Sequence, residues 1–414
     1  MTGGEALARQ LALEGVTGVF GVPGVQLDYA VDGLARVADR VGFFNTRHEQ
    51  AASYMADGYA RSAGDVGVFM VVPGPGLLNA AAGLATAYAC SSPVLCVCGQ
   101  VPSGAVGRGF GVLHEVPDQS GVLRGLTKWS GFAAAPGEVP GLVREAFWRL
   151  RSGRPRPVGL EVPPDVLEAR GTVDLVQPVG GERVEPDPEL VRKAASLLRS
   201  ARRPVIYAGG GVVAADASEA LRALAEALEA PVVVSVHARG ALSDRHRLAL
   251  SSLGGPKVLA DADVVLAVGT RFRTPGGRPV ATPPAAAVIH LNADPADLER
   301  AGGAAVSIHG DASLGLAGLA EHLDGMPPRP ARDAELDGVR RWCADQLAPF
   351  EPQMSWIRAL RAAIPDDGML VSEFTQVGYV ARVGYPVYGP RTYLGPGYQG
   401  ALGYGFPTAL GAKL

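Results

Sequence analysis

The run Thr46-Arg47-His48-Glu49 contains the residue with the clearest capacity for chemistry. Glu49 falls where a predicted strand ends and a helix rich in alanine begins. A carboxylate placed there can take part in proton transfer, or it can cap a helix whose N-terminus favours negative charge. On spacing alone, the sequence favours the capping role over the catalytic one.

Glycine and proline mark three turns that could bring backbone close to a ligand. Val22-Pro23-Gly24 follows one predicted strand, and Pro73-Gly74-Pro75-Gly76 joins another strand to a helix. A glycine-rich loop, residues 396–407, enters the last predicted helix. Glycine turns let backbone amides approach a ligand closely. The second turn matches neither a dinucleotide-binding GxGxxG pattern nor a P-loop, and a lone Pro-Gly turn is weak evidence of function.

Composition restricts the class of protein. The chain has 414 residues, of which 47% are hydrophobic and 19% are charged, and this predicts several packed domains. A formal net charge of −3 gives no basic field for nucleic acid or anionic lipid. The stretch from Leu77 to Cys98 is interrupted by polar residues, so we expect a helix and a strand there and no membrane span.

The cysteines and the N-terminus favour a reduced, cytoplasmic protein. Cys96 and Cys98 alternate within an apolar run and should be core residues of a buried strand. No CxxC pair is present, and the N-terminus lacks the basic and apolar segments of a signal peptide.

Strand and helix patterns alternate along most of the chain, which predicts α/β domains with mostly parallel sheets. Polar, proline-containing linkers are predicted at residues 168–188 and 325–330. The clearest expected strands are residues 16–22, 67–72, 94–98, 158–162, 204–212, 231–236, 264–268, 287–291 and 368–373.

Taken in order, these strings resemble the acetolactate synthase branch of the thiamine-diphosphate enzymes. Gly153-Arg154-Pro155 and Ala208-Gly209-Gly210-Gly211 extend the resemblance, which covers essentially the whole chain. It implies three doubly wound parallel-sheet α/β domains: a pyrimidine-binding domain, a central domain and a diphosphate-binding domain. We expect them at residues 1–170, 185–325 and 340–414, with the last one incomplete.

The resemblance makes Glu49 a catalytic residue, which outweighs the capping role. Its carboxylate would hydrogen-bond the aminopyrimidine ring of thiamine diphosphate and promote the imino tautomer. That imino group would remove the thiazolium proton, giving the ylid that attacks a 2-oxo acid. Pro23, Pro73 and Asn79 would line the pyrimidine pocket, with ordinary turn or core roles as the alternative.

Four further positions would contact the cofactor if the resemblance holds. The carbonyl of Gly400 would accept a hydrogen bond from the pyrimidine amino group. Leu402 would replace the methionine that usually holds the cofactor in its bent conformation, because the position needs volume and apolarity. Thr375 and Gln376 resemble a glycine-glutamine pair that approaches the diphosphate.

One departure concerns the substrate side of the site. Acetolactate synthases commonly carry a phenylalanine-glutamine-glutamate run where this chain has Leu113-His114-Glu115. His114 would therefore face the cofactor, either as a proton donor for a different substrate or as a tolerated polar neighbour. Both interpretations stay open, and histidine could change the pH dependence.

Two departures concern cofactors. Residues 251–256 lack the methionine-glycine turn of flavin-containing relatives, which favours an empty central cleft over bound FAD. The aspartate and asparagine ligands for Mg²⁺ in relatives would lie beyond Leu414, so no metal ligand is expected in this chain. The sequence thus predicts a truncated form, inactive alone, or one completed by a second chain.

The leading hypothesis is a carboligase or decarboxylase that acts on a 2-oxo acid such as pyruvate through thiamine diphosphate. The resemblance implies a homodimer or homotetramer, with the site formed between two subunits. A catalytically silent remnant that acts as a binding or assembly partner is the alternative.

Overall fold

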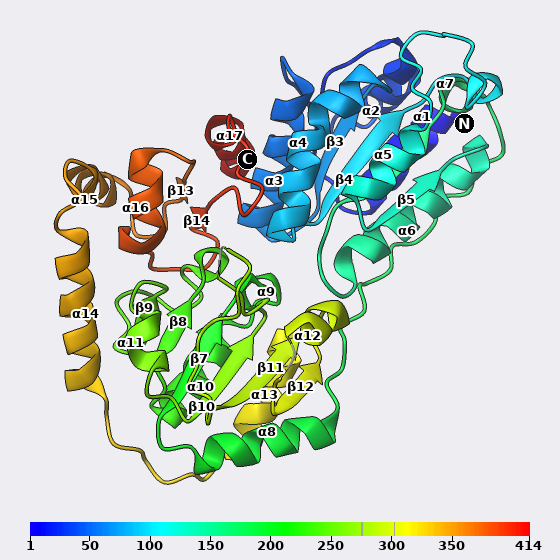
Figure 1. Ribbon diagram of the computed structural model, residues 1–414. Coiled ribbons are helices and arrows are strands. Elements are labelled where there is room, and N and C mark those ends of the chain that lie inside the picture. Colours follow the sequence, from blue (N-terminus) through cyan, green and yellow to red (C-terminus); the bar gives the residue numbers. More distant parts are fainter. Residues whose placement is uncertain (275, 302) are drawn as a thin grey trace. The chain divides into compact units, whose positions relative to one another are not determined.

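The computed structural model describes residues 1–274, 276–301 and 303–414. The chain divides into two compact units, one of residues 1–182 with 396–414 and one of residues 183–395. Each unit contains one six-stranded parallel sheet with helices between most successive strands, in agreement with the predicted α/β fold (Figure 1). The predicted boundaries of three domains stay predictions.

The first unit contains a sheet of order β2-β1-β3-β4-β6-β5. All of its strand pairs are parallel. Two of the paired strands, β1 with β3 and β4 with β6, are not consecutive in the sequence. Its elements are α1 (Gly3–Leu13), β1 (Gly18–Gly21), η1 (Val25–Leu27), α2 (Asp28–Ala35), β2 (Gly42–Asn45), α3 (Glu49–Ala63), β3 (Gly67–Val71), α4 (Pro75–Cys90), β4 (Val94–Gly99), η2 (Ser103–Ala105), α5 (Gln119–Leu126), β5 (Trp129–Phe132), η3 (Pro136–Glu138), α6 (Val139–Arg151), β6 (Val158–Val162), α7 (Pro164–Glu168) and α17 (Gly405–Lys413).

Two hydrophobic cores cover the two faces of this sheet, as the two-residue period of a strand requires. In β3, Val68 and Met70 join the core beneath α1, α2 and α6, whereas Phe69 and Val71 join the core beneath α3, α4 and α5. Cys96 and Cys98 are fully buried in the second core, which confirms their predicted role.

The second unit contains a sheet of order β12-β11-β10-β7-β8-β9, also parallel, around one continuous core. A short parallel pair, β13 with β14, begins a further α/β arrangement. Its elements are α8 (Pro188–Ser200), β7 (Pro204–Ala208), α9 (Gly210–Ala214), α10 (Ser218–Leu228), β8 (Val232–Val234), η4 (Val236–Ala238), β9 (Ala249–Ser251), α11 (Gly255–Leu259), β10 (Val264–Val268), β11 (Ala287–Asn292), α12 (Pro295–Ala301), β12 (Val306–His309), α13 (Ala312–Leu323), α14 (Asp333–Leu347), α15 (Gln353–Ala363), β13 (Leu370–Val371), α16 (Gln376–Gly384) and β14 (Tyr393–Leu394).

A buried arginine attaches the segment after α15 to the sheet of the second unit. Arg239 is 3% exposed, and it donates to Asp244 at 2.6 Å, to the carbonyl of Arg382 at 2.8 Å and to the carbonyl of Tyr385. Gly240 lies so close to the carbonyl of Gly389 that a side chain there would overlap it. These contacts explain why residues 333–395 group with the second sheet.

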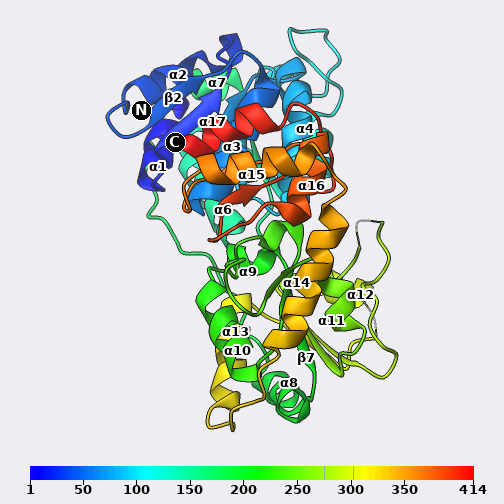
Figure 2. The same cartoon turned by 90° about the vertical axis from the view of Figure 1, so that its left-hand side faces the viewer.

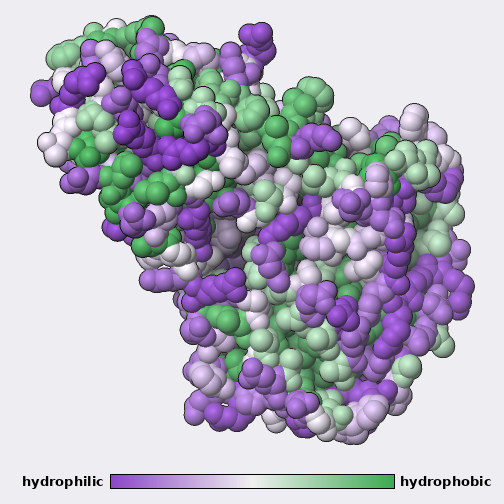
Figure 3. All heavy atoms as spheres, turned by 180° about the vertical axis from the view of Figure 1, so that it is seen from behind, coloured by the Kyte–Doolittle hydropathy of each residue, from purple (hydrophilic) through white to green (hydrophobic). Residues whose placement is uncertain are grey.

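Within the described residues, no helix is long and apolar enough to cross a membrane. On the face shown in Figure 3, hydrophilic and hydrophobic residues are interspersed.

Candidate active site

Several predicted site residues lie together at the carboxyl-terminal end of the first sheet, where its parallel strands end. Pro23 follows β1, Glu49 follows β2 and Pro73 follows β3. The chain leaves β1 toward β2 on one side and later returns to β3 on the other side, so β1 and β3 form the point where the strand order reverses. Crevices at such points are the usual ligand sites of open α/β sheets.

Close backbone packing holds the Pro23 and Pro73 turns together at this point. The missing side chain of Gly24 leaves the space that Val72 occupies, and Gly99 leaves room for the ring of Pro73. Pro73 is buried and Pro23 is exposed. The sequence suggested that glycines in these turns allow a ligand to approach, and here Gly24 and Gly99 also make room for neighbouring side chains of the protein.

Glu49 is the first residue of α3, but it does not cap the helix. The N-cap is His48, whose backbone is extended and whose Nδ1 accepts from the amide of Gln50 at 3.1 Å. The Glu49 carboxylate instead accepts a hydrogen bond at Oε2 from Nδ2 of Asn79 at 3.1 Å. Its Oε1 accepts none from the described residues. The hydrogen bond to Oε2 thus orients the half-buried carboxylate, and Oε1 can accept a hydrogen bond from a ligand.

The position of α3 is fixed by glycines of the neighbouring strand and helix, which approach it closely because they have no side chain. Gly67 of β3 packs against the carbonyl of Ala56, and Gly83 of α4 packs against Ser53. A methyl group at either glycine would overlap its neighbour. Such contacts leave α3 little freedom to shift, which keeps Glu49 at the sheet edge.

The C-terminal helix α17 packs on another side of α3, and Figures 1 and 2 both show the two helices side by side. Gly58 of α3 abuts the carbonyl of Thr408, and Gly411 of α17 abuts the carbonyl of Met55. Because neither glycine has a side chain, the two helix backbones can come into direct contact.

Polar groups reinforce this helix pair. Arg61 donates through Nη1 to the hydroxyl of Tyr404 at 2.6 Å and to Asp57 at 3.4 Å. The same nitrogen lies 3.6 Å from Sγ of Cys90 in α4. Asp57 and Tyr404 are fully buried, so these charge-assisted bonds offset part of the cost of burying them, although Oδ1 of Asp57 has no partner among the described residues.

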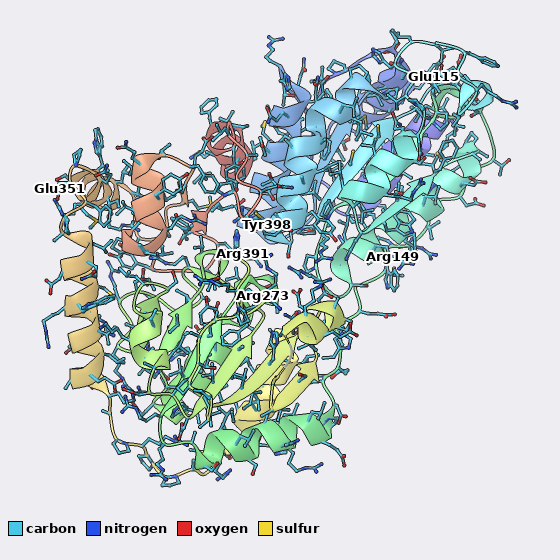
Figure 4. The ribbon with its side chains drawn as sticks, viewed as in Figure 1. Glu115, Arg149, Arg273, Glu351, Arg391 and Tyr398 are labelled. Atoms are coloured by element: carbon cyan, nitrogen blue, oxygen red, sulfur yellow. The ribbon has the colours of Figure 1, made fainter. Side chains whose placement is uncertain are left out.

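A glycine-rich loop between β4 and α5 positions His114. The Glu115 carboxylate, labelled in Figure 4, accepts from the amides of Gly109 at 2.9 Å, Gly111 at 2.6 Å and Val112 at 3.1 Å. Burial acts to raise the pKa of Glu115, but these amides outweigh it and the pKa is lowered. The hydrogen bonds between these amides and Glu115 hold the loop in a compact turn.

His114 rests on the Pro73-Gly74 turn. Its backbone is left-handed, with φ of 69°, and its carbonyl occupies the space beside Gly74 where a side chain would stand. The ring is half-buried, and Nδ1 has no hydrogen-bond partner among the described residues. His114 therefore places a buried, unpartnered ring nitrogen beside the Pro73-Gly74 turn.

The remaining predicted positions fall in both units. Gly400 has a positive φ of 65°, and Leu402 is 68% exposed; both precede α17 in the first unit. Thr375 and Gln376 lie in the second unit, where Thr375 caps α16 by accepting from the amide of Gly378 at 2.9 Å. Gln376 accepts from Gln353 at 3.0 Å. No cluster suited to a metal occurs among the residues that the structure describes.

The sequence interpretation missed a buried polar network next to the turns. Glu161 of β6, 1% exposed, accepts from Gln100, Gln119 and Ser120. A charged residue within the apolar run of residues 158–162 was the available signal, because a carboxylate between buried neighbours requires donors.

Comparison with known proteins identifies related sequences. Residues 1–122 match the family described as thiamine pyrophosphate enzyme, N-terminal TPP binding domain, and residues 191–319 match its central domain. A probable 2-ketoarginine decarboxylase, AruI of Pseudomonas aeruginosa, is 37% identical over the whole chain and 75% of its own length. The acetolactate synthase isozyme 3 large subunit of Escherichia coli is 33% identical over the whole chain and 75% of its own length.

Proposed function

Because this chain belongs to the thiamine pyrophosphate enzyme family, we propose that Glu49 is the catalytic carboxylate of its site at the reversal point of the first sheet. The protein is an acetolactate-synthase-like enzyme that uses thiamine diphosphate to act on 2-oxo acids. The observation that carries the proposal is the Asn79–Glu49 hydrogen bond, which orients one carboxylate oxygen and leaves the other available.

When bound, thiamine diphosphate supplies a carbanion that adds to the carbonyl carbon of a 2-oxo acid. The role proposed for Glu49 is to hold and release a proton at Oε1, which accepts no hydrogen bond from the described residues. Glu49 is half-buried at the end of β2, and the hydrogen bond from Asn79 restricts rotation of its carboxylate. Pro23 and Pro73 would line the pyrimidine side of the site, with Gly400 and Leu402 as further contacts. These residue types fit an apolar, aromatic ligand with polar edges.

His114 is proposed to face the substrate. Its Nδ1, which has no hydrogen-bond partner among the described residues, is the atom proposed to take part in proton transfer. A glutamine at this position could form hydrogen bonds but could not act as a general acid or base. We propose small 2-oxo acids such as pyruvate as substrates, with carboligation and decarboxylation separated by product analysis.

Thr375 and Gln376 are proposed to approach the diphosphate. The first turn of α16 offers backbone amides to an anion, and Thr375 and Gln376 are both exposed there. We propose that Mg²⁺ accompanies the diphosphate, because a hard cation prefers phosphate oxygens. Cofactor binding should then weaken when the metal is chelated.

We propose that the central cleft at the ends of β7 and β10 binds no FAD. A side chain at Gly209 or Gly211 would meet the backbone of Gly269, so this glycine turn is filled by the neighbouring turn. The glycines there serve packing between two strand ends. The purified protein should lack the visible absorbance of a flavin, and a bound flavin after purification would contradict this.

The family is oligomeric, and we propose a homodimer or homotetramer for this protein. Large apolar side chains stand exposed near the site edge, including Val25, Leu78, Phe110 and Leu113, and these would be costly to leave in water. Sedimentation of the purified protein tests this proposal, and a monomer at micromolar concentration would contradict it.

The functional test uses the protein at its full gene-encoded length, with thiamine diphosphate and Mg²⁺. A panel of 2-oxo acids that includes pyruvate and 2-ketoarginine should release carbon dioxide or form an acyloin from at least one member. Replacing Glu49 with glutamine should lower that rate by at least about a hundredfold while leaving the protein folded. The alternative of a silent binding partner would be supported by cofactor binding without any turnover across the panel.

A further inference from the structure

Gln119 joins three strand ends of the first sheet through one side chain. Its Oε1 accepts from the amide of Gly74 at 2.9 Å, beyond the end of β3. Its Nε2 donates to the carbonyl of Gly99 at 2.9 Å, the last residue of β4, and to Oε2 of Glu161 in β6 at 3.0 Å. Gln119 is 2% exposed, so water does not compete for these bonds.

A buried carboxylate anchors this arrangement. Glu161 receives three neutral donors: Nε2 of Gln100 at 2.8 Å, Nε2 of Gln119 at 3.0 Å and Oγ of Ser120 at 2.6 Å. Hydrogen bonds to an ionised group are about twice as strong as neutral ones. The carboxylate therefore fixes the orientation of the Gln119 amide, which in turn determines that Oε1, and not Nε2, faces Gly74.

Gly74 is where this network reaches the proposed active site. Its φ of 56° is one that glycine adopts readily, so the turn can bring the Gly74 amide to Oε1 of Gln119. The Gly74 carbonyl accepts the first hydrogen bond of α4, from the amide of Leu78 at 2.9 Å. The residue after Leu78 is Asn79, which donates a hydrogen bond to Glu49. The carbonyl of His114 packs against the same glycine.

We propose that Gln119 is a positioning residue: it links the Glu161 side chain to the Gly74 turn by hydrogen bonds and thereby sets the positions of Asn79 and His114. This inference rests on the proposed function for its effect on catalysis, but the hydrogen bond to Gly74 does not. Gln119 itself touches neither the substrate nor the cofactor in this role.

The neighbouring Ser120 provides a matched control. Ser120→Ala removes a hydrogen bond to the same carboxylate but leaves Gln119 bonded to Gly74. Gln119→Leu removes the link to Gly74 with a side chain of similar volume. If Gln119→Leu does not fold, Gln119→Asn replaces it, because its amide is one methylene too short to reach the turn.

Two measurements on the full chain decide the proposal. Hydrogen–deuterium exchange at the Gly74 amide should accelerate by about tenfold or more in the Gln119 variant and stay near the wild-type rate in Ser120→Ala. Calorimetric affinity for thiamine diphosphate with Mg²⁺ should fall by about tenfold in the first variant and change little in the second.

The outcomes separate this inference from the proposed function. A wild-type protein that binds no thiamine diphosphate would overturn the proposed function, whereas Gly74 exchange would still decide the link to Gln119. Equal Gly74 exchange in the two variants would overturn the link. Equal cofactor affinity in the two variants of a wild-type protein that does bind the cofactor would overturn the positioning role.

Discussion

At the scale of single residues, the site depends on a carboxylate whose partner is a neutral amide. Asn79 is the side chain that donates to Glu49 among the described residues, and it is itself exposed. An amide orients a carboxylate without neutralising it, so the group stays able to accept a proton. This differs from the helix cap suggested by spacing, a role that His48 performs instead.

Asn79→Ala tests that orientation. We expect exchange of the thiamine diphosphate ring proton to slow by about tenfold, because the carboxylate then samples several rotamers. Cofactor affinity should change less than the exchange rate. A loss of affinity with an unchanged exchange rate in the bound state would show that Asn79 binds the cofactor and does not orient Glu49.

Lys128 gives a prediction about pH. Burial, together with the charges of Arg156 and Arg149, lowers the pKa of Lys128 to about 8. Between pH 8 and the unfolded value of about 10.4 the unfolded chain binds the proton and the folded chain does not, so this group adds stability as pH rises. Its Nζ still donates to the carbonyls of Ser152 and Arg154.

The difference between wild type and Lys128→Met isolates this contribution. Wild type should gain up to about 3 kcal/mol relative to the variant between pH 8 and 10. Urea unfolding at several pH values measures the difference, since other titrating groups cancel. A flat difference would show that Lys128 keeps its ordinary pKa.

At the scale of elements, α3 is held by contacts that only glycine allows. Gly58→Ala places a methyl group against the carbonyl of Thr408, so α17 must shift away from α3. We expect a loss of about 1–3 kcal/mol in the free energy of unfolding. Gly141→Ala in α6 is the control, because no atom lies near its added methyl and the helix should gain about 0.5–1 kcal/mol. Equal effects of the two substitutions would contradict the close packing.

The elements that the sequence predicted best are those buried on both faces. The observed β6 and β10 coincide with the predicted residues 158–162 and 264–268, because continuous apolar runs mark central parallel strands. The sequence missed β5, an edge strand of the first sheet that is only partly buried, and it indicated β2, the other edge strand, only through its end before Glu49. Edge strands bury less surface and so carry a weaker pattern.

At the scale of the whole molecule, the sequence predicted the order of the α/β elements but not the contacts between distant positions. From the sequence alone, Glu161 is a single charged residue in a predicted strand, and Gln119 lies where a helix begins. They meet because β4 and β6 are neighbours in the sheet although α5, β5 and α6 separate them in sequence. Pairs of this kind follow from topology and not from local pattern.

In the second unit, substitution tests whether Arg239 holds residues 370–395 in place. Arg239→Met removes three hydrogen bonds and leaves Asp244 without its cation, so we expect a loss of about 3–5 kcal/mol and faster proteolysis of residues 370–395. Arg222→Met is the control, because among the described residues that exposed arginine pairs with Glu219 and Glu226 on its own helix, and its loss should leave stability nearly unchanged. Similar protease patterns in both variants would contradict the anchoring role of Arg239.

The most direct test of the account is nuclear magnetic resonance of the thiamine diphosphate ring proton in deuterated buffer. In the presence of Mg²⁺, the wild-type protein at its full gene-encoded length should speed the exchange of that proton. Glu49→Gln, with its fold verified by circular dichroism and its cofactor affinity measured, should slow the exchange by at least about a hundredfold. Equal exchange rates in wild type and Glu49→Gln would contradict the assignment of Glu49 as the catalytic carboxylate.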